Sequence, residues 1–328
     1  MASIREVAKR AGVSPATVSR VINETARVDE EKRERVEKAI EETGFRPNEL
    51  ARALYRKSSK IIGVIVPDIE NPFFSELAKA IEKEAYEQEY RILLCNSDDQ
   101  KEKELANLQM LAQLQADGVI LMTNTGEKSQ SYEAVSMPIV FVDRRLDEMG
   151  HTSVIEADHY AGGKLAAEYL IACGCRQITC IRGPQELSSG KRRYEGYREV
   201  CRQHSMKERF VDSTYKYEDG AKAAEEVLRR YPDTDGIIAC NDMTAVSVYK
   251  VLQKRGYRVP DDIQIIGFDG VKFGRFLTPE LTTVAQPIKE MGKCAVQMIL
   301  GTVKELPRDR EMKFPVMLIK GETTKNKM

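Results

Sequence analysis

Polar and charged side chains directly follow several short apolar runs of this chain. The runs PIVFVDR, IIACND and IIGFDG end in acids, an amide and an arginine, while KRRYEGY and TVAQP add a guanidinium group and another amide. Carboxylates accept hydrogen bonds and guanidinium groups donate them in pairs, so this set can bind adjacent hydroxyl groups such as those of a sugar. The expected polar contacts are Asp143, Arg144, Arg193, Asn241, Asp269 and Gln286.

The segment NPFF, which follows the first apolar run, supplies an amide and two aromatic rings. Phe rings can stack on the C–H faces of a sugar, and the Asn71 amide can hydrogen-bond a hydroxyl group. A Phe pair at a helix start is more often part of a core, so Phe73 and Phe74 alone are a weak signal. For Asp242 we expect a helix cap or an ion pair rather than a ligand contact.

Enzyme motifs are absent or incomplete in this sequence. GPQELSSGKRR resembles a phosphate loop, but six residues separate Gly183 from Gly190, and Arg192 stands where Ser or Thr must bind magnesium. No GxGxxG follows the first apolar run, and no GxSxG occurs. Asp143 and Asp269 could form a glycosidase pair, but neighbouring arginines should keep both carboxyl groups ionised, which suits binding and not proton donation. We therefore predict that the protein is not an enzyme.

No metal, cofactor or membrane is expected either. The three histidines are isolated, and the closest cysteines form CxC rather than CxxC. No apolar stretch reaches the roughly 18 residues of a membrane span, and MASIREVAKR lacks the features of a secretory signal. The odd number of cysteines, seven, favours reduced thiols in a cytoplasm.

Two successive arrays of strands and helices must position these side chains. From Ile61 onward, short and nearly continuous apolar runs alternate with helical stretches, and the rhythm repeats after VIEADHYAGGKL. This pattern predicts an α/β core of two doubly wound, parallel-sheet subdomains, with strand carboxyl ends lining a cleft between them. We expect the core to span 61–328, with one subdomain at about 61–160 plus 288–312 and the other at about 161–287 plus 313–328.

The first 47 residues predict an all-α head. Apolar residues recur at helical spacing from Ile4 to Ala11, Gly12 ends that helix, and Ser14 caps a second one with Pro15 at its first position. A third helix ends at Gly44. Helix, turn, helix at this spacing is a helix-turn-helix, whose second helix enters the major groove of DNA. Its expected DNA contacts are Ser14, Pro15, Ala16, Thr17, Ser19, Arg20 and Asn23.

The distribution of charge agrees with a polyanion partner for the head. Residues 1–60 carry 14 Lys plus Arg against 10 Asp plus Glu, a net of +4, whereas the remaining residues carry 37 against 41. A small helical bundle with a polar face is the competing interpretation of the turn alone. The basic head on an acidic body supports DNA binding only weakly by itself.

The segments IREVAKRAGVSPATVSRVINE and GFRPNELARAL resemble the N-terminal head of the lactose-repressor family of bacterial transcription factors. The rest of the chain resembles the sugar-binding core of that family, and most closely its ribose operon repressors. The resemblance implies a homodimeric, sequence-specific repressor of operator DNA whose effector is D-ribose or a phosphorylated ribose. It also implies an effector site at Asn71, Phe73, Phe74, Asp143, Arg144, Arg193, Asn241, Asp269 and Gln286, with Tyr215 aligned less firmly.

The resemblance also implies a hinge helix within residues 48–60 that orders on operator DNA and inserts Leu54 into the minor groove, flanked by Ala53 and Tyr55. An apolar wedge of this kind unstacks one base step at a cost of about a few kcal/mol and kinks the DNA. Pro15, Ala16 and Tyr55 depart from residues that relatives carry at these positions. The operator sequence therefore cannot be transferred from the family.

Three alternatives stay open at this point. Within the family, the chain could be a purine-responsive regulator or a catabolite-control regulator that uses a phosphocarrier protein as corepressor, and such a protein is also an additional candidate partner. A sugar-binding transport protein fits the core but not the head. Nothing in the residues fixes the sign of regulation, and we expect induction because the site suits a catabolic sugar. The expected location is the bacterial cytoplasm, at the nucleoid.

Overall fold

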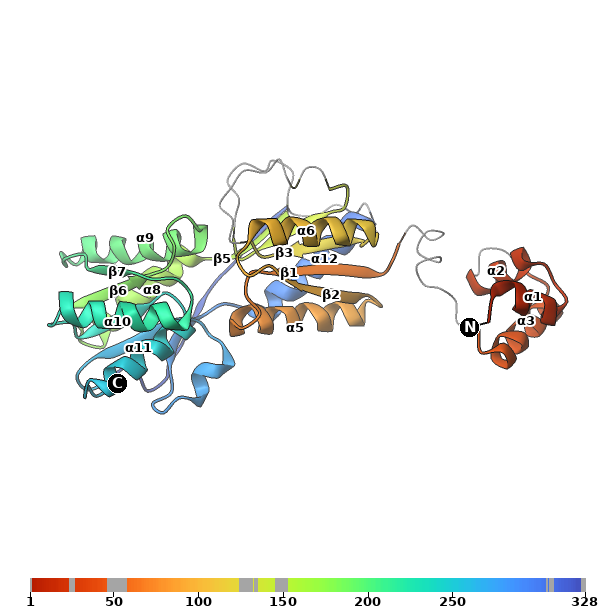
Figure 1. Cartoon of the computed structure of the whole chain (residues 1–328). Helices are drawn as coiled ribbons and strands as arrows, with labels where there is room; N and C mark the ends of the chain where they lie inside the picture. Colours follow the sequence, from red (N-terminus) through yellow and green to blue (C-terminus); the bar gives the residue numbers. More distant parts are fainter. Residues whose placement is uncertain are drawn as a thin grey trace. The chain divides into compact units, whose positions relative to one another are not determined.

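The computed structural model describes residues 2–23, 27–45, 58–123, 132, 135–144, 153–304, 306 and 310–325. The chain divides into two compact units, of which the first contains residues 1–61 and the second nearly all of the remainder. We call the helices of the first unit the head and the second unit the core (Figure 1). No helix in these described ranges is long and apolar enough to cross a membrane.

The head is built from the helices α1 (Ile4–Ala11), α2 (Pro15–Asn23) and α3 (Glu30–Thr43). Ser3 caps α1 by accepting a hydrogen bond from the Glu6 amide, and α1 and α3 end at glycines with φ of 67° and 61°, a left-handed conformation that glycine adopts without strain. One apolar stripe from each helix packs inward, with Val7, Val18 and Val36 fully buried. The three helices predicted from the sequence are confirmed.

The first subdomain of the core contains a sheet whose strand order is β11-β5-β4-β3-β1-β2. Helices α5 and α12 pack against one face of this sheet (Figure 1). On the other face, a Cβ at Gly63 would lie 2.4 Å from Leu111, so α6 lies close against β1. The elements are β1 (Ile61–Val66), α5 (Pro72–Glu87), β2 (Arg91–Asn96), α6 (Lys101–Gln113), β3 (Gly118–Leu121), β4 (Ile139–Val142), β5 (Ser153–Ala157), α12 (Ile288–Val303) and β11 (Glu311–Phe314).

The second subdomain has a sheet of order β12-β10-β9-β8-β6-β7, in which only the described pair β10 and β12 is antiparallel. Helices α8 and α9 share one hydrophobic core with this sheet, and α10 and α11 share another. The elements are α8 (His159–Ala172), β6 (Ile178–Arg182), α9 (Ser188–Gln203), β7 (Phe210–Asp212), α10 (Tyr217–Arg230), β8 (Gly236–Ala239), α11 (Asp242–Lys254), β9 (Gln264–Asp269), the 3₁₀ helix η1 (Lys272–Phe276), β10 (Thr282–Ala285) and β12 (Met317–Ile319).

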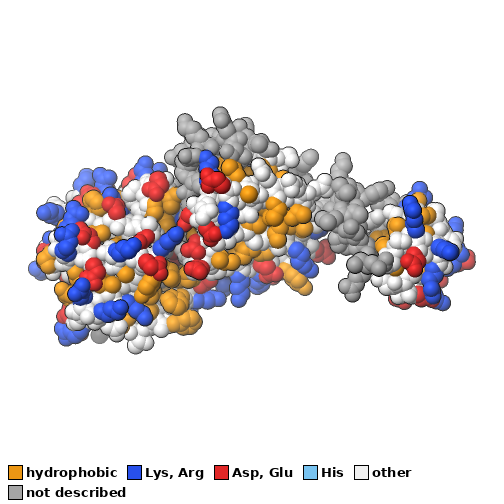
Figure 2. Space-filling model, viewed as in Figure 1, with side chains coloured by type: hydrophobic (Ala, Val, Ile, Leu, Met, Phe, Trp, Pro, Cys, Tyr) orange, Lys and Arg blue, Asp and Glu red, His pale blue; other side chains and the backbone are white. Residues whose placement is uncertain are grey.

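Near η1 the surface of the second subdomain is apolar. Phe273 is 41% and Phe276 78% exposed, and their ring centroids lie 6.3 Å apart. Figure 2 shows hydrophobic side chains gathered at the lower edge of the core. A large exposed aromatic pair of this kind is typical of an interaction surface.

The chain passes between the two sheets after β5, after β10 and between β11 and β12. Strand β11 pairs with β5 as far as Phe314, so the predicted change of subdomain after residue 312 is wrong and falls inside a strand of the first sheet. Met312 and Phe314 pack against the hydrophobic cluster of the first subdomain, whereas Leu318 packs against a hydrophobic cluster of the second subdomain. Strand β11 itself, EMKF, alternates polar and apolar residues and carries no continuous apolar run that would have marked it as a strand of the first sheet. The other predicted boundaries stay predictions.

Candidate functional site

The outward face of α2 carries the residues predicted to contact DNA. Ser14, Pro15, Ala16 and Arg20 are exposed. Ser14 Oγ accepts a hydrogen bond from the Thr17 amide at 3.2 Å, so Ser14 caps α2 as the sequence predicts. The small side chains at the start of α2 leave its backbone accessible, which permits close approach to base edges.

Several hydroxyl groups of α2 already have partners within the helix. Ser14 Oγ lies 2.9 Å from Thr17 Oγ1, and the Asn23 amide donates to Ser19 Oγ at 3.2 Å. These contacts orient the side chains. The hydroxyl oxygens keep lone pairs that can accept hydrogen bonds from bases, and the Arg20 guanidinium group remains available for phosphate or base contacts. The residues Ala53, Leu54 and Tyr55 lie outside the described residues, so the minor-groove wedge stays a prediction.

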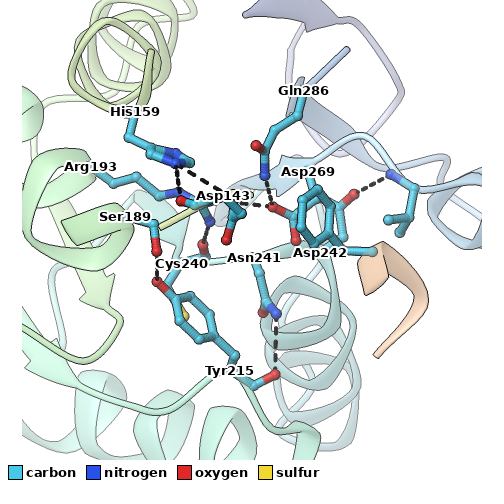
Figure 3. A network of polar contacts seen from close by, with 12 residues as sticks. Asp143, His159, Ser189, Arg193, Tyr215, Cys240, Asn241, Asp242, Asp269 and Gln286 are labelled. Atoms are coloured by element: carbon cyan, nitrogen blue, oxygen red, sulfur yellow. Dashed lines mark hydrogen bonds and ion pairs between the residues drawn. The ribbon is translucent and has the colours of Figure 1, made fainter. Parts of the chain in front are cut away.

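Figure 3 shows that the polar residues predicted from separate strand ends of the core lie close together. Asp143 follows β4, Asp269 ends β9 and Gln286 follows β10. The carboxyl ends of parallel strands lie at the same edge of a sheet, which is why residues far apart in the sequence reach one place. Arg193 approaches from the middle of α9.

Arg193 is the centre of this network. Its Nη2 donates to Asp269 Oδ1 at 3.2 Å, its Nη1 to the Cys240 carbonyl at 2.6 Å, and its Nε to His159 Nδ1 at 3.3 Å. The guanidinium carbon also lies 3.7 Å from the centroid of the Phe268 ring, close enough for a cation–π interaction. These contacts from several sides hold the guanidinium group in one orientation.

Arg144 forms the corresponding cation on the first subdomain. Its Nη1 donates to the Thr123 carbonyl at 3.1 Å, and its Nε lies 3.6 Å from Asp143 Oδ2. The guanidinium carbon lies 5.6 Å from the Phe74 ring centroid and 5.4 Å from that of Tyr215. Phe74 and Tyr215 therefore belong to the site through Arg144.

The Phe pair is also part of the first hydrophobic core. Phe73 and Phe74 are buried there and meet edge to face, with ring centroids 5.2 Å apart. Of the two, Phe74 is the ring that approaches the charged network. Both rings are therefore part of the hydrophobic core, as is common for such a pair, and Phe74 also contacts Arg144.

The two asparagines of the site are helix caps. Asn71 Oδ1 accepts from the Phe73 amide at 3.1 Å, and Asn241 Oδ1 accepts from the Thr244 amide at 2.9 Å. The same side chain donates a hydrogen bond from Nδ2 to the Tyr215 carbonyl oxygen at 3.2 Å. Asn241 thus holds both the start of α11 and the segment that carries Tyr215. It therefore has a structural role in addition to its place beside the polar network.

Asp242 has a structural role, but not the expected one of a helix cap, because Asn241 caps α11. Its Oδ2 accepts from the Val271 amide at 2.9 Å, and its Oδ1 accepts from Thr283 Oγ1 at 2.6 Å. Burial, together with the nearby charge of Asp269, raises the pKa of Asp242 well above its usual range. A carboxyl group with both oxygens occupied adds no free acceptor to the site.

Three buried polar atoms of the network have no hydrogen-bond partner among the described residues. They are Asp143 Oδ1, Arg144 Nε and Gln286 Oε1. Gln286 is nevertheless held in place, because its Nε2 donates to Asp269 Oδ1 at 2.9 Å. Buried polar atoms are nearly always satisfied in folded proteins, so two acceptors and one donor gathered here indicate a ligand that carries hydroxyl groups.

A groove of about 560 Å³ opens between the two subdomains beside this network. Asn71 is on the first-subdomain side of the groove and Tyr215 on the second, and the other predicted effector residues do not line it. Those residues are buried, and their charges contact one another. The structure therefore places the polar set at a closed contact between the subdomains, next to an accessible opening.

The pKa of Asp269 is higher than its arginine neighbours alone would predict. Burial raises its pKa to about 6 although Arg193 opposes the rise, and the charge on Asp143 adds to it. Burial therefore outweighs the attraction of the guanidinium group, which was the only influence considered from the sequence. At pH 7 the group is still mainly ionised.

His159 is a member of the network that the sequence analysis missed. Its Nε2 lies 3.1 Å from the Asp143 carbonyl oxygen, and its Nδ1 accepts from Arg193. The histidine has no motif around it, but it stands two positions after the end of β5, close to a strand end as the predicted site residues are. That position was the available signal. Among the described residues no group of His, Cys, Asp and Glu has the arrangement of a metal site.

Comparison with known proteins agrees with both units. The model of periplasmic binding proteins and the sugar binding domain of the LacI family matches residues 59–322, and that of bacterial regulatory proteins of the lacI family matches residues 3–48. The ribose operon repressor of Halalkalibacterium halodurans is 40% identical over 326 residues, which cover 99% of this chain and 98% of that protein. The ribose operon repressor of Bacillus subtilis is 40% identical over 327 residues, 99% of each chain.

A solved structure of the lac repressor dimer bound to operator and the anti-inducer ONPF has a TM-score of 0.87, at 25% identity, over 98% of both chains. The similarity extends over the helix-turn-helix head and the two-subdomain core alike. The chain therefore belongs to the LacI family of bacterial regulatory proteins, as a sugar-responsive, DNA-binding repressor and not an enzyme.

Proposed function

We propose that the effector is D-ribose and that it binds between the two subdomains of the core as an inducer. The observation that carries the proposal is a set of buried atoms without a hydrogen-bond partner among the described residues. They are Asp143 Oδ1, Arg144 Nε and Gln286 Oε1, and they lie beside the paired Arg193 and Asp269. A pentose presents several adjacent hydroxyl groups, each able to donate and accept. The names of the relatives from Halalkalibacterium halodurans and Bacillus subtilis support ribose among the sugars.

The charge of the groove favours the free sugar over a phosphorylated one. Five carboxylates line it, and Lys216 is the only cation among its described lining residues, with Nζ 3.8 Å from Asp99. A phosphate group carries nearly two negative charges at neutral pH and would be repelled there. The inner network offers no compensation, because the guanidinium groups of Arg144 and Arg193 already face Asp143 and Asp269. The five acids are Asp68, Glu70, Asp98, Asp99 and Glu218.

Closure of the two subdomains around the sugar follows from the origin of the contacts. Asp143 and Arg144 belong to the first subdomain, whereas Arg193, Asp269 and Gln286 belong to the second, so a sugar that contacts both sets stabilises their closed arrangement. We propose that this closure weakens pairing of the hinge helices within residues 48–60. An isolated helix of about 12 residues is marginal in water, and its pairing is therefore sensitive to spacing.

We expect D-ribose to release the protein from its operator. A coupling of about 1–3 kcal/mol would lower operator affinity several-fold to about a hundredfold. Titration of D-ribose into a fluorescent operator complex, read by anisotropy, measures this, and ribose 5-phosphate in a parallel titration should require a higher concentration. Tighter operator binding would reverse the sign of regulation, and no response to either compound would refute ribose as the effector.

We further propose a homodimer that binds a pseudo-palindromic operator and uses the apolar surface at Phe273 and Phe276. One short recognition helix reads only a half-site, so two linked heads are needed. Exposing the two rings to water has a free-energy cost. A second copy of the chain would cover them and would also supply the second head that the operator requires.

Phe276→Asp should therefore convert the dimer to a monomer and weaken operator binding. Two buried carboxylates facing each other across a twofold interface are strongly disfavoured. Gel filtration at micromolar protein concentration measures the oligomeric state. As a control, Phe276→Leu keeps an apolar side chain and should remain dimeric. A Phe276→Asp protein that still elutes as a dimer would exclude this surface as the interface.

The cytoplasm of a bacterium, at the nucleoid, is the proposed location. All seven cysteines are free thiols, although they include the close pair Cys173 and Cys175. Thiols persist in a reducing compartment. Operator DNA, the target of the family, lies in the same compartment.

A further inference from the structure

His159 occupies the point where the chain leaves the first sheet for the second subdomain. It is the first residue of α8 and is separated from the end of β5 by Asp158 alone. The imidazole ring is 2% exposed and lies 6.0 Å, centroid to centroid, from the Phe268 ring on which Arg193 stacks. A polar ring buried so deeply must satisfy both of its nitrogens.

Each nitrogen of the ring contacts a different subdomain. Arg193 Nε, on α9, donates to Nδ1 at 3.3 Å, and Nε2 lies 3.1 Å from the carbonyl oxygen of Asp143 at the end of β4 (Figure 3). A guanidinium group is always a donor, so Nδ1 must be unprotonated and Nε2 must carry the hydrogen that it donates to Asp143. The contacts thus fix one neutral tautomer.

The backbones of α8 and α9 hold the ring at this distance from Arg193. A Cβ at Gly163 would lie 1.9 Å from the Arg193 carbonyl oxygen, and one at Gly196 would lie 2.2 Å from the Tyr160 carbonyl oxygen. Only glycine permits such close approach of two helices. Because the helices touch along their backbones, His159 and Arg193 cannot move apart without separating α8 from α9.

We propose that His159 is a positioning residue that links Arg193 of the second subdomain to Asp143 of the first, and thereby sets the affinity for the sugar. The ring orients the Arg193 guanidinium group toward Asp269 and connects it to the backbone beside the Asp143 carboxylate. The proposal rests on the proposed sugar site for its ligand, and on the contacts of the ring for its mechanism.

The neutral state of the ring agrees with this role. Burial lowers the pKa of His159 to about 4, with Arg193 lowering it further, while Asp143 opposes the shift. Protonation would place an N–H group of the ring against the N–H group of Arg193 and break the link. The ring is therefore a fixed connector at neutral pH and not a proton switch.

A double-mutant cycle tests the link. His159→Ala should weaken D-ribose binding about tenfold, as loss of a group that orients a ligand contact does. In the Arg193→Ala background the same change should cause no further loss, because the ring acts through Arg193. His159→Gln, whose amide offers a donor nitrogen and an acceptor oxygen, should restore part of the affinity. His204→Ala, at an exposed histidine, is the matched control.

Equal losses from His159→Ala with and without Arg193 would overturn the proposal, since a general effect on packing would be additive. A second measurement needs no sugar. The chain has three histidines, so ¹⁵N spectra of histidine-labelled protein can resolve the His159 ring. We expect an Nε2-protonated neutral ring from pH 8 to pH 5, and the Nδ1 tautomer or a titration near pH 6.5 would refute the link. If the wild-type protein binds no ribose, the proposed effector fails while this measurement still tests the link.

Discussion

Replacing Arg193 by alanine should weaken D-ribose binding by about 2–5 kcal/mol, roughly 30-fold to several thousandfold. The guanidinium group donates to Asp269, to the Cys240 carbonyl and to His159, all of which are buried. In the variant the Asp269 carboxylate keeps Gln286 as a donor but loses its countercharge, and a buried charge without its partner is strongly disfavoured. Calorimetric titration with D-ribose measures the loss.

Operator binding by the unliganded Arg193→Ala protein should equal that of the wild type, because the head is a separate compact unit. Arg192→Ala is a matched control one position away on the same helix, since Arg192 is exposed and forms an ion pair with Glu195 at 3.1 Å. It should leave ribose affinity unchanged. Wild-type affinity in Arg193→Ala would remove Arg193 from the site.

Lowering the pH from 7.5 to 5 should weaken ribose binding about tenfold through Asp269. Burial raises the pKa of this carboxyl group to about 6, against the opposing effect of Arg193, so the group is ionised at pH 7.5 and about nine-tenths protonated at pH 5. Only the carboxylate can accept hydrogen bonds at both oxygens and pair with Arg193. Calorimetry across this range measures the change, and Asp269→Asn should bind weakly with little dependence on pH.

Buried groups contribute to the stability of the fold with opposite signs over the same range. The raised pKa of Asp269 stabilises the fold below about pH 4, and that contribution is lost as the pH rises through 6. The lowered pKa of His159 acts with the opposite sign, because its contribution is present above about pH 6.5 and lost as the pH falls through 4. These two contributions oppose each other, while the raised pKa of Asp242 acts with the sign of Asp269, so melting temperatures at pH 5 and 7.5 are the control. An affinity that is constant over this range would contradict the role of the Asp269 carboxylate.

The head was predictable from the sequence because its structure is local. The apolar spacing from Ile4 to Ala11, the glycine at 12 and the cap at Ser14 act over a few residues, and each appears in the structure where it was predicted. The strand ends at Asp143 and Asp269 were predictable for a related reason. Parallel strands bring their carboxyl ends to one edge of each sheet whatever the details of packing, so the residue after each run indicated which side chains lie at these edges.

Other properties of the site depend on which distant residues meet and were decided only by the tertiary structure. The sequence predicted Asn241 as a contact, but not that its amide is used to cap α11 and hold Tyr215. It also could not supply the pKa of Asp269, because burial in the folded core outweighs the charge of Arg193. The partnership of His159 and Arg193, 34 positions apart, exists because glycines let α8 and α9 touch. Periodicity shows which face of a helix is buried, whereas the distance between two helices is set by every side chain packed between them.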